Sequence, residues 1–88
     1  REEFGIPASY TQEQTRQVIK NLEAVLTAAG SSLDRVVRST VYLSDIKNFA
    51  PMNEVYKEMM PQPFPARTTL GAQLRNILVE IDVIALLE

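Results

Sequence analysis

Hydrophobic residues in the first third of the chain recur at the three- and four-residue spacing of an amphipathic helix. Thr11 and Gln14 have the spacing of a capping box, in which each side chain accepts or donates at the helix start. Gly30 supplies the left-handed residue that commonly ends a helix. We therefore predict a loop over residues 1–10 and a helix over residues 12–29. The apolar positions of this helix are Val18, Leu22, Val25, Leu26 and Ala29.

The pattern then changes to that of a strand followed by a second helix. Residues 36–43 are rich in β-branched side chains, which favours a strand. Asp45 and Asn48 are possible N-caps, and Pro51 is tolerated only in a first helical turn, so the second helix is expected to start near Asn48. The strand has one face with Val37, Ser39, Val41 and Leu43 and another with Val36, Arg38, Thr40 and Tyr42. The apolar stripe of the helix consists of Phe49, Met52, Val55, Tyr56 and Met59.

Two further strands are predicted in the last third of the chain. Prolines at positions 61, 63 and 65 end the second helix and stiffen the segment before Arg67. We predict strands over residues 67–73 and 77–87. The odd positions of the last strand are all apolar and are expected to lie under the helices, whereas the even positions include Glu80 and Asp82. This second face is apolar enough to be covered, and its carboxylates would then need partners, because burying an unpaired charge is costly.

This order of elements indicates one α+β domain over residues 1–88, with two helices on one side of a thin sheet. A chain of 88 residues is long enough for one domain and too short for two. Domains of this size have a marginal core, and the absence of cysteine and histidine excludes disulfides and the commonest zinc sites. Self-association is therefore the expected way for the chain to gain more core.

Composition also narrows the function. The formal net charge of -2, with lysine and arginine spread along the chain, gives no basic stripe for nucleic acid. No apolar run approaches the roughly 20 residues that cross a bilayer, so no membrane partner is expected. Nucleophilic histidine and cysteine are absent, the three glycines form no phosphate loop, and the acidic residues show no metal-binding spacing. The lack of cysteine fits the cytosol or an organelle matrix such as that of mitochondria.

Arg67 and Glu80 are the residues best suited to chemistry. Arg67 opens a strand after a stiff turn, and its planar guanidinium can bind a carboxylate through two parallel hydrogen bonds. Glu80 lies on the non-helical face of the last strand, where partial covering favours proton transfer. If the two strands are neighbours, both side chains face one cleft.

Each of these residues also has an ordinary interpretation. From pattern alone, Arg67 is more often an ion-pair or interface arginine, and Glu80 is more often the partner of such an arginine or of Arg38. Asn53, in the middle of the second helix, is most often a solvated or packing amide. The residues alone therefore do not assign a function.

Several short motifs, taken together and in order, change this balance. The first helix and turn contain Gln14-Thr15-Arg16-Gln17, Asn21-Leu22-Glu23-Ala24-Val25-Leu26 and Ala28-Ala29-Gly30-Ser31-Ser32-Leu33. The middle contains Val41-Tyr42-Leu43-Ser44-Asp45, Phe49 and Asn53-Glu54-Val55-Tyr56. The end contains Phe64-Pro65-Ala66-Arg67-Thr68-Thr69 and Val79-Glu80-Ile81. Over residues 13–87 the chain resembles the reactive intermediate deaminases, the Rid or YjgF family, formerly described as L-PSP endoribonucleases.

The resemblance implies a chorismate-mutase-like α+β fold assembled as a homotrimer. In such a trimer the sheets form an inner barrel, the helices lie outside, and clefts lie between neighbouring subunits. Trimerisation would cover the half-apolar second face of the sheet. Domains of this family begin with further strands before the first helix, so the chain is expected to be an N-terminally incomplete domain.

The resemblance also implies an activity that needs no cofactor: hydrolysis of enamine or imine intermediates, such as 2-aminoacrylate, to a 2-keto acid and ammonia (2-iminobutanoate/2-iminopropanoate deaminase activity). Arg67 matches the arginine that binds the substrate carboxylate, and Glu80 matches the acidic residue that positions or activates water. Asn53 matches an asparagine near the cleft, and Thr69 falls where many members have a cysteine whose backbone contributes to the site. The alternative is a non-catalytic binder of 2-keto acids. Ribonuclease activity is disfavoured, because the chain is acidic and lacks histidine.

Overall fold

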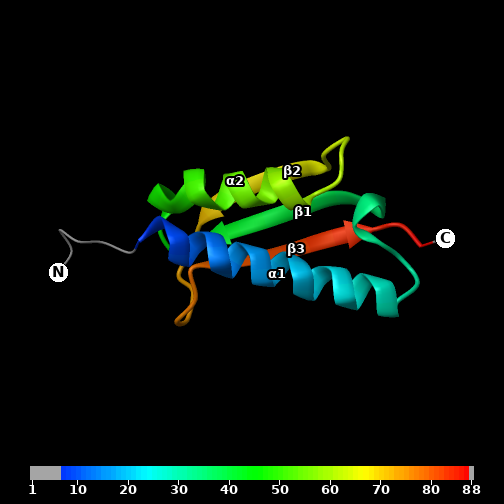
Figure 1. The fold of residues 1–88 in the computed structure, drawn as a ribbon, viewed down its shortest axis with the longest axis horizontal. Helices are drawn as coiled ribbons and strands as arrows, with labels where there is room; N and C mark the ends of the chain where they lie inside the picture. The colour runs from blue at the N-terminus through cyan, green and yellow to red at the C-terminus, as the bar shows by residue number, and fades with distance from the viewer. Residues whose placement is uncertain (1–6, 88) are drawn as a thin grey trace.

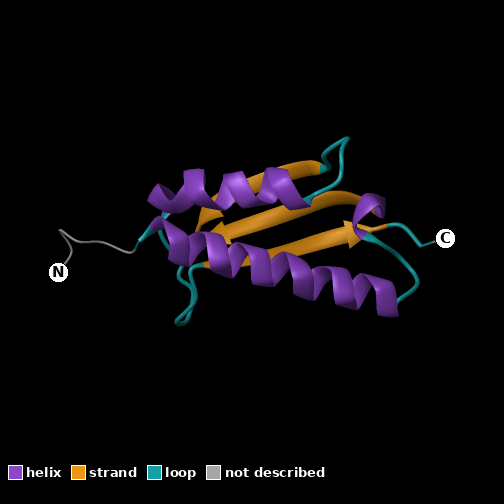
Figure 2. Ribbon diagram, viewed as in Figure 1, coloured by secondary structure: helices purple, strands orange, loops and turns teal. Residues whose placement is uncertain are grey.

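The computed structural model describes residues 7–87. Over these residues the chain forms two α-helices, three strands and two short 3₁₀ helices. Their order is α1 (Ala8–Ala28), η1 (Leu33–Arg35), β1 (Val36–Leu43), η2 (Ile46–Asn48), α2 (Phe49–Met59), β2 (Ala66–Gly71) and β3 (Val79–Ala85). Both helices pack on the same face of the sheet, giving two layers (Figures 1 and 2). The predicted α+β class and the order of elements are confirmed.

Helix α1 begins earlier than predicted. Pro7 precedes the first turn with φ of -58°, which suits a helix start, so Thr11 lies inside the helix and the predicted capping box is wrong. Gln14 does not cap the helix. Its Oε1 instead accepts a hydrogen bond from the backbone N–H of Leu78, a residue distant in sequence, at 2.8 Å. Residues 8–10 of the predicted loop are helical, and residues 1–6 lie outside the described residues.

The end of α1 follows the prediction. Gly30 has φ of +85°, a conformation that costs glycine little, and the Ser31 N–H donates to the Leu26 carbonyl at 2.8 Å. At the second helix, Asp45 accepts from the Lys47 N–H at 3.0 Å and caps η2, after which α2 starts at Phe49. The predicted start near Asn48 is therefore confirmed.

The sheet has the order β2-β1-β3, with β1 parallel to β2 and antiparallel to β3. Strand β1 has the predicted bounds. Its register with β3 shifts between Val36 and Arg38, which interrupts the alternation of side chains. As a result Val36 is buried, whereas Val37 is 45% exposed although it was predicted to share a face with Ser39.

The core lies between the helices and one face of the sheet, which we call the helix-covered face. The largest buried apolar residues come from both layers and include Ile19, Val41, Leu43, Met52, Val55 and Val79. Val79 and Ile81 are buried as predicted for the odd positions of the last strand. Strands β2 and β3 are shorter than predicted, and Ile77 and Leu87 lie beyond the ends of β3 and are exposed.

The opposite side of the sheet, which we call the open face, is covered by neither helix of residues 7–87 (Figure 2). It presents Arg38, Thr40, Tyr42, Thr68, Leu70, Glu80, Asp82 and Ile84. Ile84 is 62% exposed, and Arg38 donates a hydrogen bond to Thr68 Oγ1 across β1 and β2. Neither described helix has the length and apolar character needed to cross a membrane.

Candidate functional site

Arg67 lines a pocket between α2 and the start of β2. The cavity measures about 310 Å³. It is lined by Asn53, Tyr56, Lys57, Phe64, Pro65 and Arg67. The three residues from α2 are spaced by three and four positions, which places them on one face of the helix. The proline-containing segment that ends α2 supplies the opposite wall and leads directly into β2.

The guanidinium of Arg67 is held in this pocket by uncharged groups. Its Nη1 donates to Asn53 Oδ1 at 2.7 Å. Its Cζ lies 4.6 Å from the centroid of the Tyr56 ring and 5.4 Å from that of Phe49, which are cation–π distances. Among residues 7–87 the only ion pair joins Arg16 and Glu58, so Arg67 has no carboxylate partner there. A guanidinium has five N–H donors, and donors not used by Asn53 remain for an anion.

Tyr56 is the fixed part of the site. Its hydroxyl is 2.6 Å from Ser39 Oγ, both residues are buried, and its ring packs against Phe64 at a centroid distance of 6.5 Å. A buried hydrogen bond of this kind holds the ring in place because either hydroxyl alone would be left without a partner. The Tyr56 ring therefore gives the Arg67 guanidinium a rigid surface to lie on.

Thr69 lies two residues after Arg67 on β2 and so shares its face of the strand. It pairs with Val41 of β1. Its Oγ1 is buried and has no hydrogen-bond partner in the described part of the chain. The structure thus brings together three of the four predicted site residues, Asn53, Arg67 and Thr69, on the helix-covered side of β2.

Glu80, the fourth, lies elsewhere. It pairs with Tyr42 on the open face, and β1 separates its strand from β2. The condition under which Arg67 and Glu80 would face one cleft, that their strands are neighbours, is therefore not met. The α2 crossover places β2 parallel to β1 on one edge, which leaves the other edge of β1 to β3. Within one protomer Arg67 and Glu80 do not share a cleft.

Next to Glu80, the open face has a hydrogen bond between a phenol and a carboxylate. The Tyr42 hydroxyl donates to Asp82 Oδ2 at 3.1 Å. This hydrogen bond, with the negative charge of the same carboxylate, raises the pKa of Tyr42 above its ordinary value, and the charge of Glu80 adds to the shift. Tyr42 is therefore a neutral hydrogen-bond donor at neutral pH.

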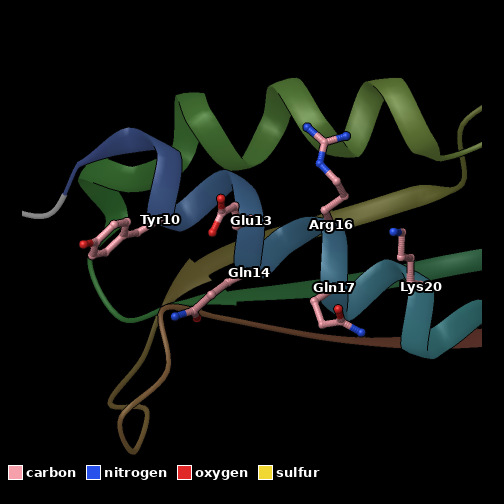
Figure 3. Close-up of a pocket in the computed structure, with 6 residues that line it drawn as sticks. All are labelled: Tyr10, Glu13, Gln14, Arg16, Gln17 and Lys20. Atoms are coloured by element: carbon pink, nitrogen blue, oxygen red, sulfur yellow. The ribbon is translucent and has the colours of Figure 1, made fainter.

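A larger cavity, of about 580 Å³, lies along α1 (Figure 3). Its lining residues are Tyr10, Glu13, Gln14, Arg16, Gln17 and Lys20, all from one helix. Several are already engaged: Arg16 points to α2 and pairs with Glu58 at 3.5 Å, and Gln17 donates to Asn21 at 2.8 Å. This groove lacks side chains from a second element, so the Arg67 pocket is the better candidate site.

Sequence reasoning did not identify Tyr56, Lys57 and Phe64 as pocket residues. The spacing of Tyr56 and Lys57 from Asn53 on one helix was a usable signal, but nothing in the sequence places Phe64 opposite them. Residues 7–87 hold no group of three or more histidine, cysteine, aspartate or glutamate side chains that could bind a metal.

The fold and pocket define a small α+β domain with a pocket lined by Arg67 and Lys57, and comparison with known proteins gives its family. Residues 3–87 match the family described as Endoribonuclease L-PSP. The Neisseria meningitidis protein NMB1025, a member of the YjgF family, has a structure that superposes with a TM-score of 0.86 at 31% identity, covering 89% of this chain and 68% of that one. The chain therefore belongs to the L-PSP endoribonuclease, or YjgF/Rid, family, as its motifs predicted.

Two relatives show the range of names within the family. Protein mmf2, mitochondrial, of Schizosaccharomyces pombe is 61% identical over 61 residues, which are 69% of this chain and 48% of that protein. Reactive Intermediate Deaminase A, chloroplastic, of Arabidopsis thaliana is 40% identical over 78 residues, which are 86% of this chain and 42% of that protein. The chain thus spans about half the length of these curated relatives.

Proposed function

We propose that this chain carries the substrate-binding part of an enamine/imine deaminase. The reaction adds water to a 2-imino acid, such as the imine form of 2-aminoacrylate, and releases a 2-keto acid and ammonia. The observation that carries the proposal is the Arg67 guanidinium, which is held by Asn53 and two aromatic rings and lacks a carboxylate partner among the described residues. The name of the Arabidopsis relative, a reactive intermediate deaminase, supports the same reaction class.

In this mechanism Arg67 binds the substrate carboxylate through two parallel hydrogen bonds, which fixes the adjacent imine carbon. Asn53 keeps the guanidinium oriented, since its side-chain oxygen already accepts from Nη1. Protonation of the imine nitrogen makes the carbon electrophilic, water attacks it, and ammonia leaves with the C–N bond electrons. Thr69, beside Arg67, would contact the substrate through its backbone.

Glu80 is proposed to position or activate the attacking water. Because Glu80 lies on the open face, it can reach a substrate held by Arg67 only if two copies of the chain meet. We therefore include a homotrimer in the proposal, with the open faces turned inward and the sites at subunit boundaries. The exposed Ile84 and Leu70 on that face would be covered in such an assembly.

The compartment is part of the same proposal. The Schizosaccharomyces pombe relative is named as mitochondrial, which fits the organelle-matrix alternative of the expected locations. We propose the cytosol or the mitochondrial matrix, where pyridoxal-phosphate enzymes release 2-aminoacrylate.

A coupled assay tests the function. A pyridoxal-phosphate dehydratase generates 2-aminoacrylate, and pyruvate release is followed with and without the chain. The chain should accelerate release, and Arg67→Ala should reduce the acceleration about 100-fold, because the substrate is no longer held in position. Arg75→Ala changes an exposed arginine outside the pocket and should leave the rate unchanged. Acceleration that survives Arg67→Ala would contradict the proposal.

The second candidate is a non-catalytic binder of 2-keto acids. It is favoured by one observation: the Arg67 pocket forms within a single chain, whereas Glu80 lies on the other face. Pyruvate would then raise the melting temperature through Arg67 without any acceleration in the coupled assay. RNA cleavage, which the family description names, is not proposed, and cleavage that survives Arg67→Ala would count against the Arg67 mechanism.

A further inference from the structure

The Arg67 pocket contains a second cation. Lys57 lines the same cavity and lies one helical turn after Asn53 on α2. Residues four apart on a helix have Cβ atoms about 5–6 Å from each other. Because Asn53 Oδ1 contacts Arg67 Nη1 at 2.7 Å, the two cationic side chains flank one small space.

The acidic residues of α2 do not neutralise this pair. Glu54 accepts from Gln12 Nε2 at 2.6 Å, and Glu58 pairs with Arg16 at 3.5 Å, so both carboxylates contact side chains of α1. Lys57 itself is exposed and takes part in no ion pair among residues 7–87. The six lining residues include two cations and no carboxylate.

The Arg67 guanidinium and the Lys57 ammonium suit different anionic groups of a ligand. The fork of Arg67 suits a carboxylate held in fixed orientation next to the reacting carbon, whereas the ammonium of Lys57 on a flexible stem suits a more distant anion. Tyr56, Phe64 and Pro65 supply apolar surface for the carbon chain of the ligand. A cavity of about 310 Å³ is at the small end of ligand pockets, which fits a short acid.

We infer that Lys57 makes this pocket selective for acids with two carboxylates, namely 2-imino and 2-keto dicarboxylic acids, over monocarboxylic acids of the same chain length. The inference rests on the proposed function, since Arg67 must hold the carboxylate beside the imine. Lys57 acts here as a specificity residue: it contacts the distal carboxylate and takes no part in the reaction at the imine carbon.

The test compares 2-ketoglutarate with 2-ketovalerate, which have equally long carbon chains and differ in the distal carboxylate. Calorimetric titration of the full chain at low ionic strength should give about fivefold tighter binding of 2-ketoglutarate, the size expected of a partly exposed charge pair. Lys57→Gln should abolish this preference, because it weakens binding of 2-ketoglutarate more than binding of 2-ketovalerate. Lys20→Gln removes the same charge from the α1 groove and should keep the preference. Raising the salt concentration should reduce the preference of the wild type.

The outcomes separate this inference from the proposed function. If 2-ketovalerate binds through Arg67, but the wild type shows no preference for the diacid or Lys57→Gln keeps it, the role of Lys57 is overturned and the Arg67 site stands. If neither acid binds the wild type, or both bind Arg67→Ala as well as the wild type, the Arg67 site itself is overturned. Neither of these two outcomes gives the expected affinities of the wild type and of Lys57→Gln for the two acids.

Discussion

The helix-covered face and the open face of the sheet are built from the same three strands but carry different parts of the protein. On the helix-covered face Val41, Leu43 and Val79 are at most 1% exposed, and the Arg67 pocket lies at its β2 edge. On the open face Ile84 is 62% exposed beside two carboxylates. One chain therefore completes its core and the Arg67 pocket on the helix-covered side, while Glu80 lies on the side that the proposed trimer would cover.

A charge introduced on the open face should have the largest effect on assembly and stability. Ile84→Lys would replace an apolar contact inside the proposed assembly by a charged ammonium opposite Arg38, with which Ile84 pairs, at a cost of several kcal/mol. We expect a sedimentation experiment to show loss of the trimer and a lower melting temperature. Val25→Lys changes a residue that is similarly exposed, at 66%, but lies on α1, and should leave the assembly intact. A wild type that melts cooperatively as a monomer at every concentration would contradict the proposed trimer.

A cavity in the core beneath the helices should lower the free energy of unfolding by nearly as much. Met52 is fully buried between α2 and the sheet, and Met52→Ala removes its contacts and leaves a cavity. The expected loss of unfolding free energy is about 3 kcal/mol. Urea titration at fixed protein concentration measures it, with Met59→Ala at a half-buried position of the same helix as the milder control. Equal losses for the two variants would show that the core does not lie where the structure places it.

Loss of the buried hydrogen bond between Tyr56 and Ser39, beneath the pocket, should lower the stability by a smaller amount. Tyr56→Phe keeps the ring under Arg67 but leaves Ser39 Oγ buried without its partner at 2.6 Å. We expect a loss of about 1–2 kcal/mol in unfolding free energy, with little change in pyruvate binding. The double variant Tyr56→Phe/Ser39→Ala removes both hydroxyls and should recover part of the stability. No recovery in the double variant would show that the lost bond is not the cause.

The smallest expected effect is a shift in the absorbance titration of Tyr42, on the open face. Tyr42 donates to Asp82, and its raised pKa means that it ionises at higher pH than a free tyrosine. Since the pKa is raised in the folded state, any stabilisation from this bond is present at neutral pH and lost as pH rises through the folded-state pKa. Asp82→Asn should move the Tyr42 absorbance titration to lower pH, with Tyr42→Phe identifying the signal. An unmoved titration would exclude Asp82 as the cause.

Much of the fold was predictable from local pattern. The bounds of β1, the stop at Gly30 and the helix start near Asn48 follow from residues adjacent in sequence. The start of α1 was missed although Pro7 is a local signal for it, because the spacing of Thr11 and Gln14 indicated a later start. The contact that Gln14 makes instead, with Leu78 64 residues further along the chain, follows from no local pattern. The shift of register at Val36 likewise depends on pairing with β3.

The site was predicted less completely, for a topological reason. Arg67 and Asn53 were both identified, and the structure places them in contact. Alternation along β3 placed Glu80 on the non-helical face, but no local pattern states which strand occupies which edge of β1. The order β2-β1-β3 therefore separated two residues that a different order would have made neighbours.

The proposed function depends on binding of the carboxylate of a small 2-keto acid in the Arg67 pocket. Titration of pyruvate into the ¹⁵N-labelled chain, followed by its amide resonances, tests this binding. We predict that the largest shift changes occur at Asn53, Arg67 and Thr69 and disappear in Arg67→Ala. Shift changes centred on the α1 groove between Tyr10 and Lys20, or changes that persist in Arg67→Ala, would contradict carboxylate binding by Arg67.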